Sequence, residues 1–381
     1  MPLHNELEGT LVVSLEQAVA APYAGLLLAD AGARVIKVER PEGDFARGYD
    51  AGAAGQSTVF AWLNRGKESI ALDLRNSDDR ALMTRLLARA DVFLSNLAPG
   101  AVDRLGLDTA TLQHANPGLV CVRITGYGET GSAAERKAYD ALVQGESGVC
   151  SVTGTPEQPS RVGVSLTDLS TGLTAFSAVL RALLQRHRTG RGCEISISMF
   201  DVMADWMNMP LLAHRYGGGA PQRTGLQHSF IAPYGAFTCA RGEPVLLSIQ
   251  SNREWAAFCE QVLEQPELID DPRYRDNPDR YANRASLDAT VNTAFASLPR
   301  ETVLQRLDAA RIANARLNSV SELSDHPQLR ELTAVHNGVE IAMAALPVPS
   351  AQGPHTAVPQ ADEHGDRIRA EFPPATHGDP P

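Results

Sequence analysis

One aspartate of this 381-residue chain stands where a carboxylate could act as a nucleophile. Asp168 is the first residue of a segment, 168–187, whose apolar residues recur at helical spacing, so we expect it just before the first turn of a long amphipathic helix. Asp is a preferred N-cap residue, and a structural cap explains its presence. A helix N-terminus also keeps a carboxylate ionised, and an ionised carboxylate can attack an electrophile. The residues alone leave both interpretations open.

Three further polar motifs each follow a short apolar run that is typical of a strand. They are Lys37–Pro41, Ser95–Gly100 with Arg104 shortly after it, and Gly126–Gly128. Ligands of open α/β sheets bind beyond the carboxyl ends of the strands, so these motifs are candidates to line one crevice. Ordinary turns, in which Gly, Pro, Asn and Ser are common, also account for them.

Several kinds of chemistry are disfavoured because their sequence patterns are missing. The turn after the first apolar run, Glu16–Pro22, contains neither a G-x-G-x-x-G fingerprint nor a P-loop lysine, which disfavours an NAD enzyme or an ATPase. The ten histidines show no metal-binding spacing, and no G-x-S-x-G nucleophile elbow is present. We therefore expect no metal site.

The composition of the chain disfavours some classes of partner and some cellular compartments. Lys and Arg number 34 against 45 Asp and Glu, a net charge of −11, which disfavours nucleic acid while leaving room for a small phosphorylated ligand. The five cysteines are odd in number and form no C-x-x-C pair, as expected in a reducing compartment. No signal-peptide pattern and no apolar run of about 20 residues is present, so we expect a cytoplasmic protein without membrane contact.

Strand and helix patterns alternate through the first part of the chain. Helices are expected at 18–31 and 78–90, and the expected strands are 10–15, 35–38, 70–72, 91–94, 119–124 and 194–199. Such alternation is typical of βαβ units and predicts an α/β protein with a mostly parallel sheet.

A second, smaller domain is expected after a glycine-rich segment, 217–219. Strand patterns at 234–237 and 245–249 favour an antiparallel arrangement, and helical patterns follow at 255–264 and 286–296. From about residue 346 the chain is rich in Pro, Gly and His, which predicts a strap or a frayed tail.

The segment Pro22–Pro41 closely resembles the opening of the class III CoA-transferases, a family that includes formyl-CoA and carnitine CoA-transferases and α-methylacyl-CoA racemase. The resemblance covers about the first 330 residues and keeps one order of motifs: Leu72–Leu74, Asn96, Pro99–Gly100, Arg104–Leu107, Tyr139–Asp140, Asp168 with Gly172, Thr189–Gly192 and Ala232–Tyr234. It implies a Rossmann-like large domain that binds CoA (1–210), a smaller α+β domain (215–320), a C-terminal segment (321–381) that returns to the large domain with a Pro-rich tail, and an interlocked homodimer.

The resemblance also implies a mechanism. The family's catalytic aspartate falls on Asp168, which would attack an acyl-CoA thioester to give a mixed anhydride and then an aspartyl-CoA thioester. An acceptor carboxylic acid would reverse these steps, so that CoA and acyl-CoA are substrates and no permanently bound cofactor is needed. The family's CoA contacts fall on Arg40, Leu72, Asn96, Arg104 and Lys137.

One position separates the transferases of the family from its racemases. The racemases carry an acid/base His where this chain has Tyr139, and a phenol with an ordinary pKa of about 10 is a poor base near neutral pH. Tyr139 therefore favours a transferase in which it lines the acyl pocket, although simple packing also explains it. A non-catalytic CoA-binding subunit is a further alternative, and the presence of Asp168 argues against it.

The resemblance extends to the substrate. The formyl-CoA members carry Gln where this chain has Val19, and a Gly-rich loop where it has Cys259–Gln261, which disfavours oxalate and formate. The segments 315–318 and 326–328 resemble the branch that uses succinyl-CoA and C4–C5 dicarboxylates such as malate, citramalate, mesaconate or itaconate. A second carboxylate on the acceptor would need a cation, for which Arg223 and His228 are the candidates.

Overall fold

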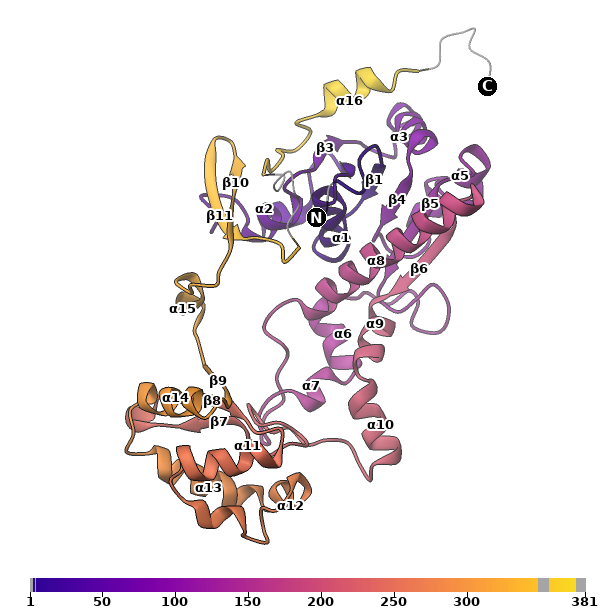
Figure 1. Ribbon diagram of the computed structural model, residues 1–381. Helices are drawn as coiled ribbons and strands as arrows, with labels where there is room; N and C mark the ends of the chain where they lie inside the picture. The colour runs from indigo at the N-terminus through magenta and orange to yellow at the C-terminus, as the bar shows by residue number, and fades with distance from the viewer. Residues whose placement is uncertain (1–2, 4, 349–355, 375–381) are drawn as a thin grey trace. The chain divides into compact units, whose positions relative to one another are not determined.

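The computed structural model describes residues 3, 5–348 and 356–374 (Figure 1). The chain divides into two compact units. The first comprises Met1–Val149, Arg161–Met209 and Arg330–Pro381, and the second comprises Cys150–Ser160 and Pro210–Leu329.

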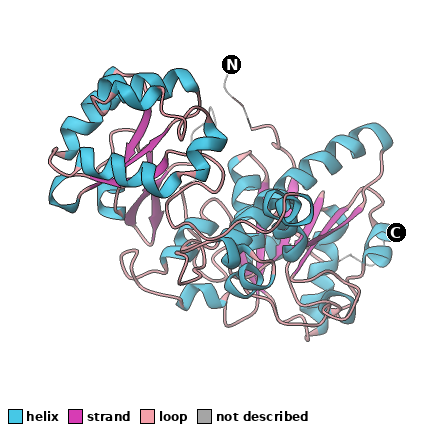
Figure 2. Cartoon of the chain, turned by 90° about the horizontal axis from the view of Figure 1, so that it is seen from below, coloured by secondary structure: helices cyan, strands magenta, loops and turns pink. Residues whose placement is uncertain are grey.

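A parallel sheet of six strands lies between helices in the first unit (Figure 2). In spatial order its strands are β3 (Glu68–Ala71), β2 (Arg34–Glu39), β1 (Leu11–Leu15), β4 (Val92–Ser95), β5 (Val120–Thr125) and β6 (Glu194–Ser198). This order is that of a doubly wound α/β sheet, in which the winding reverses between β1 and β4. The predicted α/β class and parallel sheet are confirmed.

Neighbouring residues of β1 enter opposite hydrophobic cores because side chains alternate along a strand. Val12 packs in the core formed with α1 (Ala20–Asp30) and α8 (Leu166–Thr189). Val13 packs in the core that includes residues of α3 (Ser77–Arg89), α5 (Thr109–Ala115) and α16 (Gly365–Glu371). Helices thus cover both faces of the sheet, which leaves the ends of its strands for polar groups that contact a ligand.

Shorter elements complete the first unit. They are η1 (Phe45–Gly48), α2 (Thr58–Asn64), α4 (Ala101–Arg104), α6 (Asp140–Glu146), α9 (Met199–Trp206) and the hairpin of β10 (Glu331–His336) with β11 (Val339–Ala344). Two helices, α7 (Val149–Val152) and α10 (Asn208–Tyr216), span the points where the chain passes from one unit to the other.

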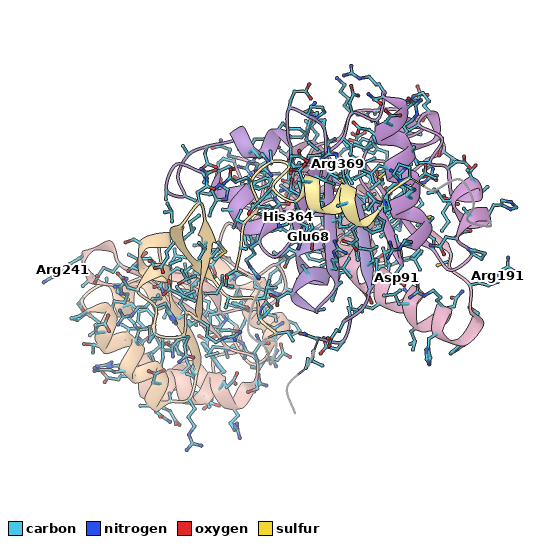
Figure 3. All side chains as sticks on the ribbon, turned by 90° about the horizontal axis from the view of Figure 1, so that it is seen from above. Glu68, Asp91, Arg191, Arg241, His364 and Arg369 are labelled. Atoms are coloured by element: carbon cyan, nitrogen blue, oxygen red, sulfur yellow. The ribbon has the colours of Figure 1, made fainter. Side chains whose placement is uncertain are left out.

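Part of the C-terminal segment is a strap rather than a frayed tail. Its helix α16 lies beside β3, with His364 next to Glu68 in the view of Figure 3. The His364 Nδ1 accepts a hydrogen bond from the backbone N–H of Ser69 at 3.2 Å, and Arg369 donates one to the carbonyl of Ala71 at 2.9 Å. The remaining parts of the expected tail, 349–355 and 375–381, lie outside the described residues.

The second unit has its own core around Trp255, Phe258 and Phe295. Its antiparallel sheet has the order β7 (Tyr234–Thr238), β8 (Pro244–Ser248), β9 (Ala313–Arg316). The helical segments are α11 (Asn252–Ala257), α12 (Asn277–Ala282), α13 (Arg284–Phe295), α14 (Arg300–Ala309) and α15 (Val320–Ser324), with short turns η2 (Ala240–Gly242), η3 (Phe258–Val262) and η4 (Pro266–Ile269). The helix expected at 255–264 is in fact α11 followed by the π-helical turn η3.

The division into units differs from the predicted domain boundaries in two places. Residues 150–160, expected in the large domain, belong to the second unit, as do 321–329. The first difference has a clear cause: the Arg223 guanidinium donates hydrogen bonds to the carbonyls of Thr155 at 2.8 Å and Pro156 at 2.9 Å. A contact between segments this far apart leaves no periodic signal in the sequence.

A glycine allows α8 to approach α1 closely. A Cβ added to Gly172 would lie 2.5 Å from the carbonyl oxygen of Ala20 and 3.0 Å from the Cβ of Tyr23. We expect Gly172→Ala to push the helices apart and lower the free energy of unfolding by about 1–3 kcal/mol, measured by urea denaturation. Gly145→Ala in α6 is the control, because an added Cβ there meets nothing within 4 Å. An equal effect of both substitutions would contradict this account.

Candidate active site

Asp168 lies inside the first turn of α8 and does not cap it. The helix begins at Leu166, its N-cap residue is Ser165, and the side chain of Ser165 makes no capping hydrogen bond. The expectation that Asp168 precedes the helix is therefore wrong by three residues. The cap comes from another helix.

Asp140, the first residue of α6, caps α8 from outside. Its Oδ1 accepts hydrogen bonds from the backbone N–H groups of Thr167 at 2.8 Å and Asp168 at 3.3 Å. Its Oδ2 accepts one from Nε2 of Gln144 at 2.8 Å, and Gln144 Oε1 accepts one from the backbone N–H of Val162 at 2.8 Å. Helix α6 thus fixes both the start of α8 and the loop that leads to it.

The electrostatic environment of Asp168 is unfavourable for a negative charge. Burial, and secondly the nearby Asp140 carboxylate, raise the pKa of Asp168 to about 7. The helix N-terminus is expected to favour the ionised carboxylate, but it does not lower the pKa of Asp168, because Asp140 accepts the hydrogen bonds of the N–H groups of Thr167 and Asp168. Within the described part of the chain, no group donates a hydrogen bond to the Asp168 carboxylate. A carboxylate held in this way is more basic than usual and has both oxygens available.

Tyr49, which follows η1, is a neighbour of Asp168 that the sequence analysis missed. Burial raises the pKa of Tyr49 to about 12, with further contributions from Asp44, Asp168 and Tyr139. Its ring lies 5.7 Å from that of Phe45, and the guanidinium of Arg40 lies 6.0 Å from the Phe45 ring. At neutral pH the phenol stays protonated and can donate a hydrogen bond. Its only sequence signal is an exposed aromatic residue in a loop, which is too common to identify it.

A cavity of about 490 Å³ opens at the carboxyl ends of β1, β2, β3 and β4. It includes the point where the sheet reverses its winding, the usual ligand site of such folds. Arg40 and Leu72, both predicted to contact CoA, line it. Arg75 adds a second cation to the lining, and its guanidinium pairs with Asp73 at 2.9 Å.

The other predicted CoA contacts lie elsewhere. The side chain of Asn96 binds the backbone of the turn between β1 and α1: its Oδ1 accepts a hydrogen bond from the N–H of Gln17 at 2.9 Å, and its Nδ2 donates one to the carbonyl of Gln17 at 2.8 Å. Arg104 lines a separate cleft of about 580 Å³ together with Arg123. Lys137 is exposed. The structure therefore brings together two of the five predicted CoA contacts, and Asn96 acts on the turn at the cavity wall.

A buried network of charged side chains lies beneath the turn between β1 and α1. The Lys37 ammonium is 2.8 Å from Asp44 and 3.4 Å from Glu16, and the Lys67 ammonium is 2.5 Å from Glu16, with all four side chains fully buried. Burial lowers the pKa of Lys67 to about 8. Asp44 also accepts a hydrogen bond from the backbone N–H of Ala18 at 3.2 Å, which holds that residue in a left-handed conformation (φ 61°).

The predicted substrate residues divide between the two units. In the first, Val19 is buried against Leu169 of α8, and Tyr139 precedes α6 with 61% of its surface exposed. In the second, Arg223 is occupied by backbone carbonyls, and His228 stacks on Tyr234 at 4.9 Å between ring centroids. Burial and secondly Arg284 lower the pKa of His228, so this imidazole is neutral at pH 7.

Comparison with known proteins identifies the family. The model of CoA-transferase family III matches residues 7–365. The chain belongs to this family. It is therefore a class III CoA-transferase, and the resemblance inferred from the motifs is confirmed.

Relatives of known activity cover most of the chain. The acetyl-CoA:oxalate CoA-transferase of Acetobacter aceti is 36% identical over 372 residues, which are 96% of this chain and 95% of that protein. The succinyl-CoA:glutarate CoA-transferase of Mus musculus is 34% identical over 340 residues, 88% of this chain and 76% of that one. The crystal structure of a CAIB/BAIF family protein from Brucella suis covers 96% of this chain and 99% of its own, with 33% identity and a TM-score of 0.83.

The described residues of this family III chain also lack two features. No group of three or more His, Cys, Asp or Glu residues in 3, 5–348 and 356–374 has a geometry that fits a metal ion. Over the same residues, no helix is both long and apolar enough to cross a membrane.

The raised pKa of Asp168 predicts that the free energy of unfolding depends on pH. Since its folded-state value of about 7 exceeds the value of about 3.9 in an unfolded chain, the free energy of unfolding falls as pH rises from about 4 to about 7. We expect Asp168→Asn to exceed the wild type in stability by about 1–3 kcal/mol at pH 8 and to match it near pH 4, measured by urea denaturation.

The control for this measurement is Asp108→Asn. Asp108 caps α5, and hydrogen bonds from Thr111 lower the pKa of Asp108, so its replacement should give no gain at pH 8. A wild type that is as stable as Asp168→Asn at pH 8 would show that the Asp168 carboxylate ionises without cost.

Proposed function

We propose that this enzyme transfers CoA from succinyl-CoA to a dicarboxylic acid, a C4–C5 diacid being the preferred acceptor, through covalent intermediates on Asp168. The observation that carries this proposal is the placement of Asp168, a basic and half-buried carboxylate with no hydrogen-bond donor on it among the described residues. A structural aspartate would be paired or capping, whereas a nucleophile needs a free oxygen.

The chemistry needs only carboxylates and thioesters. An oxygen of Asp168 attacks the thioester carbonyl, the C–S bond breaks, and a mixed anhydride and CoA thiolate result. The thiolate then attacks the Asp168 carbonyl, which forms the aspartyl-CoA thioester and releases the donor acid. The acceptor carboxylate repeats these steps in reverse. Tyr49, protonated at neutral pH, donates a hydrogen bond to the oxygen that gains charge, as in an oxyanion hole.

CoA would occupy the cavity at the carboxyl ends of the strands. Its adenine would contact the backbone near Leu72, while Arg40 would bind its phosphates, with Arg104 and Lys137 as further cations and Asn96 holding the turn. The line of rings from Phe45 to Tyr49 runs from the Arg40 side toward Asp168, which gives the pantetheine arm an apolar wall.

The relatives support a diacid acceptor, because oxalate and glutarate, named for two of them, both carry two carboxylates. Val19 and Tyr139 would line the acyl pocket. The Arg223 cation, or the N–H of the neutral His228 imidazole, would bind the second carboxylate. All five cysteines are free thiols, which fits a cytoplasmic location.

We further propose an interlocked homodimer. Leu173, Leu180 and Leu184 lie on one face of α8 and are 50%, 37% and 64% exposed, an apolar stripe that a second copy would cover. Light scattering coupled to size-exclusion chromatography is expected to give twice the chain mass, 40.8 kDa, and a monomer at micromolar concentration would contradict the proposal.

The covalent route is tested by intact-mass spectrometry after incubation with succinyl-CoA. We expect the wild type to gain an adduct that hydroxylamine converts to a hydroxamate at Asp168, and Asp168→Ala to gain none. Asp201→Ala is the matched control, because Asp201 is likewise the third residue of its helix, α9, and its variant should form the adduct as the wild type does. In a parallel sample without hydroxylamine, the enzyme that carries the adduct is offered malate, mesaconate, glutarate and oxalate.

Absence of an adduct with both succinyl-CoA and acetyl-CoA, although CoA binds, would overturn the covalent mechanism. Exchange of the α-proton of a 2-methylacyl-CoA in deuterated water would then identify the racemase alternative. An adduct that forms but is discharged by no diacid would retain the mechanism and reject the proposed acceptor.

A further inference from the structure

The contact between Asp140 and the start of α8 is unusual for a helix cap. A capping carboxylate ordinarily belongs to the residue just before its own helix, whereas Asp140 belongs to α6 and is 27 residues from Thr167 in the sequence. It binds the N–H of Asp168 as well, so it places a second negative charge beside the nucleophile. A neutral cap such as Ser or Asn would satisfy the same N–H groups without that charge.

We propose that Asp140 is a positioning residue whose carboxylate, by taking the N–H groups at the start of α8 and standing against Asp168, favours conversion of Asp168 from a free carboxylate to the neutral aspartyl-CoA thioester. This inference rests on the proposed covalent function. Asp140 does not contact the reacting atoms, and it acts through the energy of Asp168.

The half-reaction shows why the charge matters. Asp168 and an acyl-CoA exchange partners: the C–S bond of the donor breaks, a C–S bond to Cγ of Asp168 forms, and one Asp168 oxygen leaves in the released carboxylate. The Asp168 carboxylate beside Asp140 is consumed, and the carboxylate of the released donor acid, which is in water, carries the negative charge instead. Whatever free energy the site adds to the Asp168 anion is therefore recovered when the thioester forms.

Other groups near Asp168 do not supply this effect. Tyr49 is a protonated phenol at pH 7, Tyr139 is 61% exposed, and Tyr23 of α1 lies against Gly172, farther along α8. The carboxylates of α9, Asp201 and Asp205, are exposed. Arg123 of β5 and Glu194 of β6 pair with each other at 3.4 Å.

Gln144 and the start of α8 keep the Asp140 carboxylate in place. One of its oxygens accepts the two backbone hydrogen bonds and the other accepts from Gln144, whose own carbonyl oxygen is tied to Val162. These donors fix the position of the Asp140 carboxylate, whereas no described residue donates such a hydrogen bond to the Asp168 carboxylate. The two carboxylates are therefore inequivalent, a stabilised one and a destabilised one, as in other paired carboxylate sites.

The test compares Asp140→Asn with the wild type in two measurements. The first is the pH dependence of the single-turnover rate of adduct formation at saturating succinyl-CoA, which reports ionisation of Asp168. The second is the equilibrium constant of the half-reaction at pH 8.5, obtained by intact-mass spectrometry at known ratios of succinyl-CoA to succinate. Thermal unfolding confirms that the variant is folded.

Asp140→Asn is expected to lower the midpoint of the pH profile from about 7 by about 1–2 units and to lower the equilibrium constant by the matching factor, about tenfold for each unit. If Asp140 had only a structural role, its replacement would change the rates but would not shift the midpoint of the pH profile and the equilibrium constant by matching amounts. Asp108→Asn, which removes the corresponding charge from the cap of α5, is the control and should leave both quantities unchanged.

Each outcome decides the matter. A wild type without an adduct on Asp168 overturns the proposed function and this inference with it. An adduct in the wild type, with the same midpoint and constant in Asp140→Asn, overturns this inference alone. Should Asp140→Asn fail to fold, Asp140→Ser is the second variant, since Ser also accepts hydrogen bonds at a helix start. If neither folds, a wild-type midpoint near 7 supports the proposal, and one at or below about 5 overturns it.

Discussion

Four charged side chains sealed from water hold together the edge of the sheet at which the cavity opens. Lys37 lies between Glu16 and Asp44, and Lys67 binds Glu16 from the other side. An added Cβ on Gly25 of α1 would lie 2.9 Å from the Glu16 carboxylate, so the helix passes close to the network. Removing one charge from such a group leaves its partner buried and unpaired, which costs about 3–5 kcal/mol. The network therefore fixes the loops after β1 and β2 relative to β3.

The turn between β1 and α1 connects this rigid network to the helix that carries Asp168. Asp44 and Asn96 hold the backbone of the turn, and Val19 at its end packs against Leu169, the residue that follows Asp168. On the other side of α8, α6 holds the helix start through Asp140. Two independent sets of contacts thus place one carboxylate, and a reacting group needs such placement because small displacements are costly to catalysis.

Local patterns in the sequence predicted the elements better than the contacts between them. The strands of the parallel sheet and the helix of Asp168 follow from apolar periodicity, and the order of motifs assigned Asp168 a role. The cap by Asp140 and the proximity of Tyr49 depend on segments that are distant in the chain, so composition and spacing carry no trace of them. The same reason explains why the grouping of residues 150–160 with the second unit was not predicted: hydrogen bonds from Arg223 and Gly225 hold them there.

The ionised carboxylate of the active site is destabilised, whereas the ionised carboxylates of the buried network are stabilised by their ion pairs. The Glu16 side chain is fully buried, yet two ammonium groups lower its pKa and keep it charged. Asp168 is less buried, has no cationic partner among the described residues, and faces another anion, so its charge is disfavoured. A thioester exchange benefits from this contrast, because the free energy that folding stores in an unstabilised carboxylate is returned when that carboxylate becomes a neutral thioester. Rigid surroundings are what prevent the site from relaxing around the charge instead.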